Sequence, residues 1–404
     1  MKRVLTGILV FGLLLGSFAL GLERDFYAEI DTAIAANAEH LSIDAPFAIL
    51  IEKETGTVIF EKDADTPTAP ASVTKIMTML LIIEEIIAEG LQMDDMITAS
   101  ANAASKGGSQ IFLEEGEQMT VRDLLKSIVV SSANDASAAM AEHIAGSEET
   151  FVARMNERAQ ELGMHNTIFL NSSGLPIVDE DGTERENQTT ARDVALMSRE
   201  VIQHDLIKEF TTIWMDSVRN GEFGLSNTNR LIYHFEGATG LKTGFTQTAM
   251  HCLAATAMRD GVEYIAVVLH AESSDARFES AKTLLNFAFA NYTLLRIQPD
   301  EVLAPIPVAL GASDHIQPML GGADSGSNAI LLPQNLAATV TQSVTIDDGV
   351  EAPVTAGQTL GTLTVYDGET VIVEVPIIAA DAVERVSTGQ VFLRFIRLLF
   401  TGSR

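Results

Sequence analysis

Residues 69–78, Ala-Pro-Ala-Ser-Val-Thr-Lys-Ile-Met-Thr, place a serine at position 72 and a lysine at position 75 where a helical pattern begins. Apolar residues recur at three- and four-residue spacing from Ile76 to Ile87, which predicts a long helix. Positions i and i+3 share a helix face, so the Lys75 amine can reach the Ser72 hydroxyl. Serine is a weak nucleophile without an adjacent base, and a lysine whose pKa is lowered by burial and a nearby cation can be that base.

Two further motifs follow along the chain, Ser132-Ala133-Asn134 and Lys242-Thr243-Gly244. The first interrupts a helical pattern at 121–144, and the second lies on a predicted strand, 241–246. Lys242 would supply the cation that lowers the pKa of Lys75. Each motif alone has an ordinary interpretation: Ser72 as a helix cap, Asn134 as a turn residue, Lys242 as a solvated lysine. Together, in this order and these contexts, they predict one catalytic site.

Outward from these motifs, residues 40–292 mix strands and helices, which predicts one α/β (α+β) domain with a sheet flanked by helices. The predicted strands are 47–52, 57–61, 241–246, 251–258 and 262–270. The predicted helices begin at Ser72 and cover 121–144 with its interruption, 149–162, 189–202 and 277–292.

Beyond Ile297 the helical periodicity fades, and a hairpin pattern around Asp367-Gly368 predicts a small all-β domain, residues 297–383. Residues 387–400 then form a basic, aromatic-rich amphipathic pattern. It favours a helix bound to a membrane surface, and the alternative is a helix packed on the protein or in a dimer contact.

The N-terminus has Lys2 and Arg3 before an apolar stretch, residues 4–20, and a small-x-small pattern ending at Gly21. This predicts a signal peptide, residues 1–21, with an uncleaved signal anchor as the alternative. In either case the body of the protein lies outside the cytoplasm.

The composition excludes several classes of protein. Hydrophobic residues make up 47% of the 404 residues, which excludes disorder over the whole length. A formal charge of −29 argues against nucleic acid as a partner. One cysteine, Cys252, excludes an intrachain disulfide and a thiolate zinc site. We expect neither a metal nor a cofactor.

The three motifs resemble those of the penicilloyl-serine transferases (β-lactamase-like fold), and within them the D-alanyl-D-alanine carboxypeptidases, which are low-molecular-mass penicillin-binding proteins. The resemblance extends over about residues 40–292 and includes the segments 69–78, 107–109, 131–136, 171–175, 190–193 and 227–231. It implies a catalytic domain at 22–296, the β domain at 297–383 and a membrane-anchor helix at 384–404.

The resemblance also implies roles for the motif residues. Ser72 would attack the carbonyl between the two terminal D-alanines of a peptidoglycan stem peptide, Lys75 would take its proton, and Ser132 would relay a proton to the leaving amine. Asn134 would hold Lys75 and the substrate amide. Besides Asn134, the implied substrate-binding set has Lys242, Thr243 and Arg277 near the terminal carboxylate of the substrate. Gly244 would let its strand approach closely, and the backbone N–H groups of Phe245 and Ser72 would form the oxyanion hole.

Two other functions share these motifs. A serine β-lactamase is disfavoured because no Glu-x-x-Leu-Asn lies between the second and third motifs. A non-hydrolytic penicillin-binding module of the envelope is disfavoured because all three motifs are intact. Cleavage of cross-links as an endopeptidase stays open. The expected place is the outer face of the cytoplasmic membrane, with stem peptides as substrates and β-lactams as inhibitors.

Overall fold

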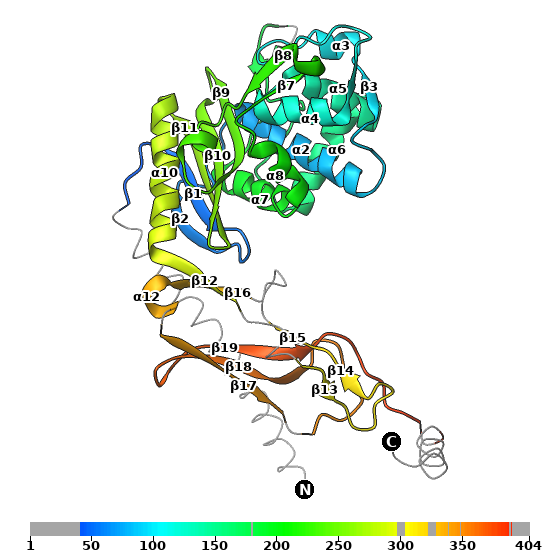
Figure 1. Cartoon of the computed structure of the whole chain (residues 1–404), viewed down its shortest axis with the longest axis vertical. Helices are drawn as coiled ribbons and strands as arrows, with labels where there is room; N and C mark the ends of the chain where they lie inside the picture. The colour runs from blue at the N-terminus through cyan, green and yellow to red at the C-terminus, as the bar shows by residue number, and fades with distance from the viewer. Residues whose placement is uncertain are drawn as a thin grey trace. The chain divides into compact units, whose positions relative to one another are not determined.

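The computed structural model describes residues 41–178, 181–296, 304–321, 329–337, 339–347, 349–387 and 389. The chain divides into two compact units, one within Ile34–Ala290 and one from Asn291 onward (Figure 1). The expected signal peptide and residues 390–404 of the expected anchor lie outside the described residues. Within the described ranges, no helix is both long enough and apolar enough to cross a membrane.

The first unit is built on a five-stranded antiparallel sheet with the order β2-β1-β11-β10-β9, so β9 lies at an edge. All five strands were predicted, with small differences at their ends. Their bounds are β1 Phe47–Glu52, β2 Val58–Lys62, β9 Ala238–Thr246, β10 Met250–Arg259 and β11 Val262–Ala271.

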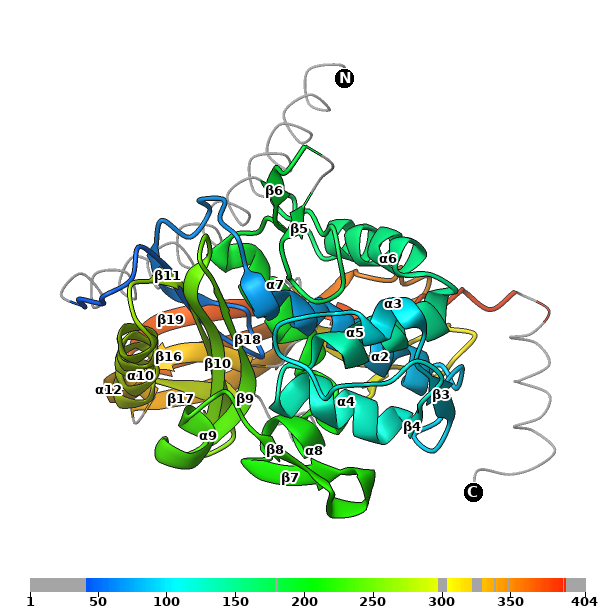
Figure 2. The ribbon, with the colours of Figure 1, turned by 90° about the horizontal axis from the view of Figure 1, so that it is seen from above.

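Side chains of the central strand β11 alternate between two helical layers, as the two-residue period of a strand requires. Ile265 and Val267 join the main apolar core. Tyr264 points to the other face, where its ring contacts Phe289 of α10 (Ser274–Asn291) with centroids 4.9 Å apart. Figures 1 and 2 show α10 on one side of the sheet and the helices α2, α4, α5, α7 and α8 on the other. The predicted sheet flanked by helices is confirmed.

Helix α2 (Lys75–Ile87) follows directly on a short 3₁₀ helix, η1 (Ala71–Thr74), and is buried from Lys75 through Ile83. The expected interruption of the second helical region is also present, between α4 (Val121–Val130) and α5 (Asn134–Ala145). The other helices of this unit are α3 Ala101–Ala104, α6 Glu148–Glu161, α7 Ala191–Val201, α8 Asp205–Thr211 and α9 Leu231–His234, with a 3₁₀ turn η2 at Arg219–Gly221.

Three short two-stranded sheets in this unit were not predicted. Their strands are two to four residues long, too short for an alternating apolar pattern to be recognised. They are β3 Met96–Thr98 with β4 Gln118–Thr120, β5 Ile177–Val178 with β6 Glu184–Arg185, and β7 Met215–Val218 with β8 Phe223–Ser226.

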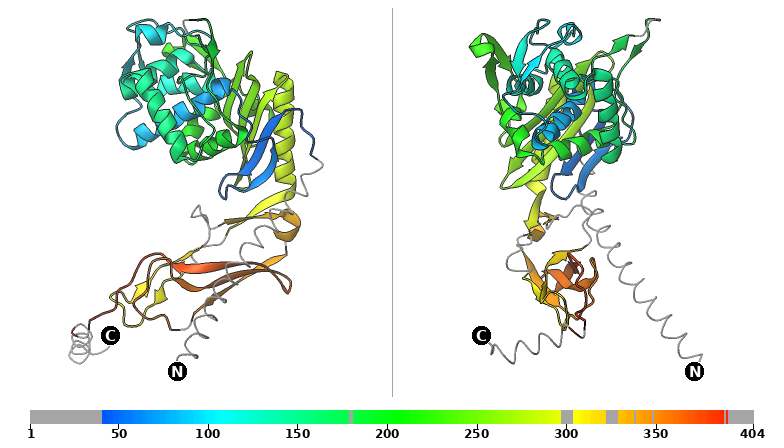
Figure 3. Two further views of the ribbon diagram at one scale, coloured as in Figure 1. Left: turned by 180° about the vertical axis from the view of Figure 1, so that it is seen from behind. Right: turned by 90° about the vertical axis from the view of Figure 1, so that its right-hand side faces the viewer.

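The second unit is β-rich, as predicted, with only the one-turn helix α12 (Gln334–Ala337) among its described residues (Figure 3). The expected hairpin is formed by β18 and β19, whose residues Leu363 and Ile377 are fully buried in one core. The strands are β12 Tyr292–Arg296, β13 Ile306–Pro307, β14 His315–Ile316, β15 Pro318–Leu320, β16 Ala329–Pro333, β17 Val340–Ile346, β18 Thr359–Asp367 and β19 Thr370–Ala379.

Candidate active site

Ser72 lies in η1, directly before α2, and its hydroxyl oxygen accepts a hydrogen bond from Lys75 Nζ at 3.1 Å. Pro70, not Ser72, occupies the capping position of η1, and no side chain caps it. The interpretation of Ser72 as a plain helix cap is therefore wrong. The helical spacing brings the serine and the lysine together as expected.

Lys75 is fully buried, and its Nζ has two further acceptors, Asn134 Oδ1 at 2.6 Å and the Ser173 carbonyl at 2.7 Å. Burial, followed by repulsion from Lys242, holds the pKa of Lys75 well below its usual value, and Asp135 opposes this shift. As a neutral amine, Lys75 keeps two N–H bonds for Asn134 and Ser173. Its lone pair is then left facing the Ser72 hydroxyl, which is the arrangement a general base needs.

Asn134 begins α5 and is held on both its backbone and its side chain by the loop before α4. Its backbone N–H donates to the Ser109 carbonyl at 2.7 Å, and its Nδ2 donates to the Gly107 carbonyl at 2.7 Å. Because Oδ1 faces Lys75, Asn134 links this loop to the base. The expected contact between Asn134 and Lys75 is present.

The same loop is fastened at its other end by Arg219, in η2 between β7 and β8. Arg219 donates to the Ile111 carbonyl at 2.7 Å and pairs with Glu117 at 2.7 Å. The Ile111 N–H in turn donates to the buried carboxylate of Asp135, at 3.1 Å to Oδ2. Arg219 thus reaches Asn134 through two intermediate groups. It belongs to no motif, and nothing in the sequence pointed to it.

Ser132 lies in the break between α4 and α5, 3% exposed and with a φ of +66°. Such a conformation is unfavourable for a residue other than glycine, and it is concentrated at functional sites. The Ser132 hydroxyl has no hydrogen-bond partner in the part of the chain that the structure describes. A buried polar atom left in this state is available to a substrate group.

The third motif lies on the edge strand β9 and passes very close to the nucleophile. A Cβ at Gly244 would lie 2.7 Å from the Pro70 carbonyl oxygen and 3.0 Å from the Ser72 nitrogen. Only glycine permits this approach without displacement of the backbone, which is the role that the resemblance implied for Gly244. The next residue, Phe245, has an exposed side chain stacked near His251, with ring centroids 4.5 Å apart.

Lys242 is 1% exposed, and its Nζ donates to the Thr243 carbonyl at 3.0 Å. Burial and then the Arg277 charge lower the pKa of Lys242 to about 7. The Thr243 hydroxyl donates to Thr228 Oγ1 at 2.7 Å. Thr228 therefore contacts the third motif directly.

Arg277 extends from α10 to the backbone of the sheet. Its Nη1 donates to the carbonyls of Gly244 at 2.9 Å and Cys252 at 3.2 Å, and burial lowers its pKa to about 10. Arg277, Lys242 and Lys75 are therefore three buried basic side chains, in which Arg277 lowers the pKa of Lys242 and Lys242 lowers the pKa of Lys75. Cys252 is buried and its pKa is raised to about 11 by burial, consistent with a structural residue.

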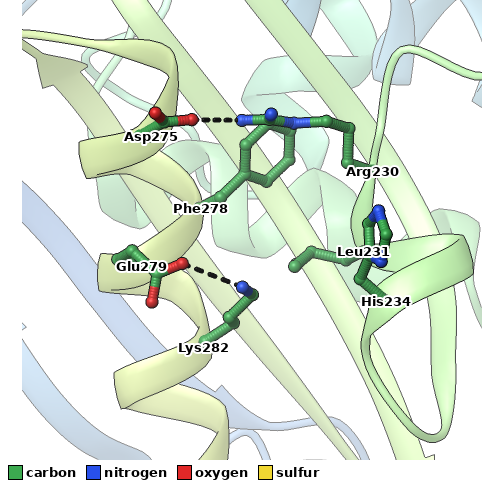
Figure 4. A pocket seen from close by; sticks show the side chains of 7 residues that line it. All are labelled: Arg230, Leu231, His234, Asp275, Phe278, Glu279 and Lys282. Carbon is green, nitrogen blue, oxygen red and sulfur yellow. Dashed lines mark hydrogen bonds and ion pairs between the residues drawn. The ribbon is translucent and has the colours of Figure 1, made fainter.

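A surface pocket of about 120 Å³ lies beside this region, between α9 and α10 (Figure 4). Arg230 pairs there with Asp275 at 2.6 Å and lies over the Phe278 ring, 4.7 Å from its centroid. Figure 4 shows a second pair in the pocket, between Lys282 and Glu279 at 2.8 Å. Because these charges are already paired, the pocket offers no free ion to a ligand.

Several functional contacts were missed because they involve backbone atoms or residues outside the motifs. Ser173 supplies a carbonyl to Lys75, and Asn171 supports that turn by accepting the Gly174 N–H at 2.6 Å. Asn187 donates to Thr74 Oγ1 at 2.9 Å, next to Lys75. The segment 171–175 is part of the family resemblance, but a backbone carbonyl carries no side-chain signal, so the sequence does not reveal its role.

Among the described residues, Glu84, Glu200 and His204 bring three possible metal ligands together. The guanidinium of Arg158 lies between the two carboxylates, at 2.8 Å from Glu84 and 2.7 Å from Glu200. This cluster is an ion-pair network around an arginine, and we assign no metal to it.

Comparison with known proteins gives consistent matches over both units. Residues 33–273 match the family model described as D-alanyl-D-alanine carboxypeptidase, and residues 298–385 match the C-terminal domain of penicillin-binding protein 5. D-alanyl-D-alanine carboxypeptidase DacF of Bacillus subtilis is 38% identical over 98% of this chain and 97% of its own length.

Solved structures agree with these matches. Penicillin binding protein 5 from Haemophilus influenzae has a TM-score of 0.71 and 25% identity, covering 85% of this chain and 98% of its own. Penicillin-binding protein D2 from Listeria monocytogenes, in its ampicillin-bound form, has a TM-score of 0.56 and 30% identity, covering 62% of this chain and 99% of its own.

Proposed function

The chain belongs to the D-alanyl-D-alanine carboxypeptidase family and is a serine peptidase with the penicillin-binding fold, and we propose that it forms its acyl-enzyme on Ser72 with Lys75 as the base. The observation that carries this proposal is the 3.1 Å contact between Ser72 Oγ and a fully buried Lys75. The family acts on peptidoglycan peptides that end in D-Ala-D-Ala and binds β-lactams. These two residues would perform the bond cleavage.

In the acylation step, Ser72 Oγ attacks the carbonyl carbon of the penultimate D-alanine while Lys75 takes the hydroxyl proton. The N–H groups of Ser72 and Phe245 stabilise the oxyanion, in accord with the close approach of Gly244 to Ser72. The peptide bond then breaks as Ser132 passes a proton to the departing amine of the terminal D-alanine. Lys75 returns a proton to Ser132.

In the second step, water attacks the Ser72 ester and releases the shortened peptide. Lys75 accepts the proton of that water and returns it to the Ser72 oxygen, which restores the starting state. No redox change and no added co-reactant other than water is involved.

Substrate binding follows from the position of β9 at the sheet edge, where an extended peptide can pair with exposed backbone groups. We place the terminal carboxylate at Lys242 and Thr243, with Arg277 supporting that end through the Gly244 carbonyl. Asn134, which contacts Lys75, would bind the substrate amide. For this its Nδ2 exchanges the Gly107 carbonyl for the substrate.

The test is time-resolved mass spectrometry of the purified protein with benzylpenicillin, alongside release of D-alanine from a D-Ala-D-Ala peptide. The proposal predicts a long-lived adduct on Ser72 and release of D-alanine, both abolished in Ser72→Ala. Rapid loss of the adduct with penicillin turnover and no D-alanine would indicate a β-lactamase. No adduct with a folded protein would favour a non-hydrolytic module.

Members of this family act in the cell wall, outside the cytoplasm. We propose that residues 1–21 direct export and are removed, and that residues 384–404 hold the enzyme peripherally on the outer face of the cytoplasmic membrane. The support is the sequence pattern alone. Deleting residues 387–404 should release a soluble, active enzyme, and membrane association that survives this deletion in the cleaved form would contradict the anchor.

A further inference from the structure

Glu186 is a partly covered carboxylate that the proposed mechanism does not use. It follows β6 and precedes Asn187, which contacts Thr74 beside the nucleophile. Both of its carboxylate oxygens are buried and have no hydrogen-bond partner among the described residues. The Thr246 hydroxyl, on β9, lies near this carboxylate and favours its charged form.

A buried carboxylate without a partner is unfavourable, since its charge has lost water and gained nothing in exchange. Burial accordingly raises the pKa of Glu186, the Thr246 hydroxyl opposes this rise, and the nearby Glu184 adds to it. The residue as a whole is only partly covered, and contact with a bound cation requires a change of rotamer that turns the carboxylate outward. A cationic donor would remove the unfavourable state.

The position of Thr246 along β9 shows which part of a substrate would meet Glu186. Lys242 and Thr243 lie at the terminal-carboxylate end, and Gly244 passes the Ser72 nitrogen. Thr246 is two residues further on, about 6.6 Å along the strand, on the side of the acyl group. The substrate residue before the penultimate D-alanine has its Cα only about 3.8 Å beyond that residue.

We propose that Glu186 binds a primary ammonium group on the side chain of the substrate residue that precedes D-Ala-D-Ala. The inference rests on the proposed function, because it needs the peptide to lie along β9 with Ser72 at the scissile bond. A flexible side chain such as that of lysine reaches past Thr246 to Glu186 from this position. Glu186 therefore gives the site a preference for a diamino acid in the stem peptide.

The test compares two peptides that differ by one charge, Nα-acetyl-L-Lys-D-Ala-D-Ala and the same peptide acetylated also on Nε. Release of D-alanine is followed for the wild type, for Glu186→Gln, and for Glu184→Gln as a matched control on the adjacent exposed carboxylate. We expect the wild type to prefer the free ammonium by about tenfold to a hundredfold in kcat/KM, mostly through KM. Glu186→Gln should remove most of this preference, and Glu184→Gln should keep it.

Three results would overturn the proposal. The first is a wild type that releases D-alanine from both peptides at equal rates. The second is a Glu186→Gln enzyme whose kcat/KM falls by the same factor for both peptides. The third is an acyl-enzyme that accumulates in Glu186→Gln with either peptide, which would make Glu186 a base for deacylation. Failure of the proposed function would look different, since the wild type would then release D-alanine from neither peptide and form no Ser72 adduct.

Discussion

The two units of the molecule differ in what they bury. The first unit encloses Lys75, Lys242 and Arg277 together with a set of buried serines, asparagines and threonines. Among the described residues of the second unit, every buried side chain is uncharged, Thr364 and Tyr292 are the buried ones with a hydroxyl group, and the two apolar clusters are aliphatic. Burying a charge is costly unless it is paired or used. We infer from this contrast that the first unit loses stability by burying the charges that the proposed chemistry uses, and that the second unit does not.

The largest expected effect comes from removing the buried base. Lys75→Ala leaves Ser72 with no group to take its proton, and general-base catalysis contributes about 10²- to 10⁴-fold. We expect the rate of acylation by benzylpenicillin to fall by that factor with folding intact, as measured by stopped-flow kinetics and circular dichroism. A variant that acylates within threefold of the wild type would remove Lys75 from the mechanism.

Gly244→Ala tests the close approach of β9 to the nucleophile. The added methyl group would lie 2.7 Å from the Pro70 carbonyl oxygen, so strand and nucleophile must separate. Overpacking of this kind destabilises by about 1–3 kcal/mol, and a displacement near 1 Å lowers rates by about 10²-fold. Acylation kinetics and thermal unfolding measure the two effects, and an unchanged acylation rate would show that the approach is not needed for catalysis.

Arg219→Gln tests whether the loop behind Asn134 must be fastened. The variant loses the ion pair with Glu117 and the bonds to the loop carbonyls, which leaves Asn134 less well positioned. We expect acylation to slow by about tenfold, within the range that misplacement of a catalytic group can produce. Arg192→Gln is the matched control, because Arg192 pairs with Asp65 and Glu61 and contacts none of the site residues. Equal effects of the two substitutions would contradict a positioning role for Arg219.

The smallest effect on catalysis is expected in the second unit. Leu363 is fully buried in its core, so Leu363→Ala should destabilise that unit by about 2–5 kcal/mol. Calorimetry should report this loss while acylation stays within twofold of the wild type. A large loss of acylation would mean that the second unit contributes to the site, and the contrast between the units would fail.

The sequence predicted those strands and helices of the first unit that have a recognisable local pattern of apolar residues. Short apolar runs bounded by turn residues located all five sheet strands, and helical spacing located α2 and the break at Ser132. It also brought Ser72, Lys75 and Asn134 to one site, because each belongs to a recognisable motif. The Ser173 and Gly107 carbonyls were beyond prediction, since any residue can supply a carbonyl.

Arg219 and Glu186 were missed for a different reason. Arg219 acts on a loop that is distant in sequence, and the hairpin that carries it has strands too short to show a period. Glu186 stands out only when its surroundings are known, because its lack of a partner is a property of the folded chain. Such residues require the three-dimensional structure.

The central claim is that Ser72 is activated by a neutral Lys75, and the pH dependence of acylation tests it most directly. A lowered pKa leaves Lys75 neutral above it, so the second-order rate constant with benzylpenicillin should rise with pH to a plateau. Its midpoint should lie well below the usual lysine value of 10.5. Lys242→Ala removes a repelling cation and should move this midpoint upward. A wild-type midpoint near 10.5, or one that Lys242→Ala leaves in place, would contradict the account.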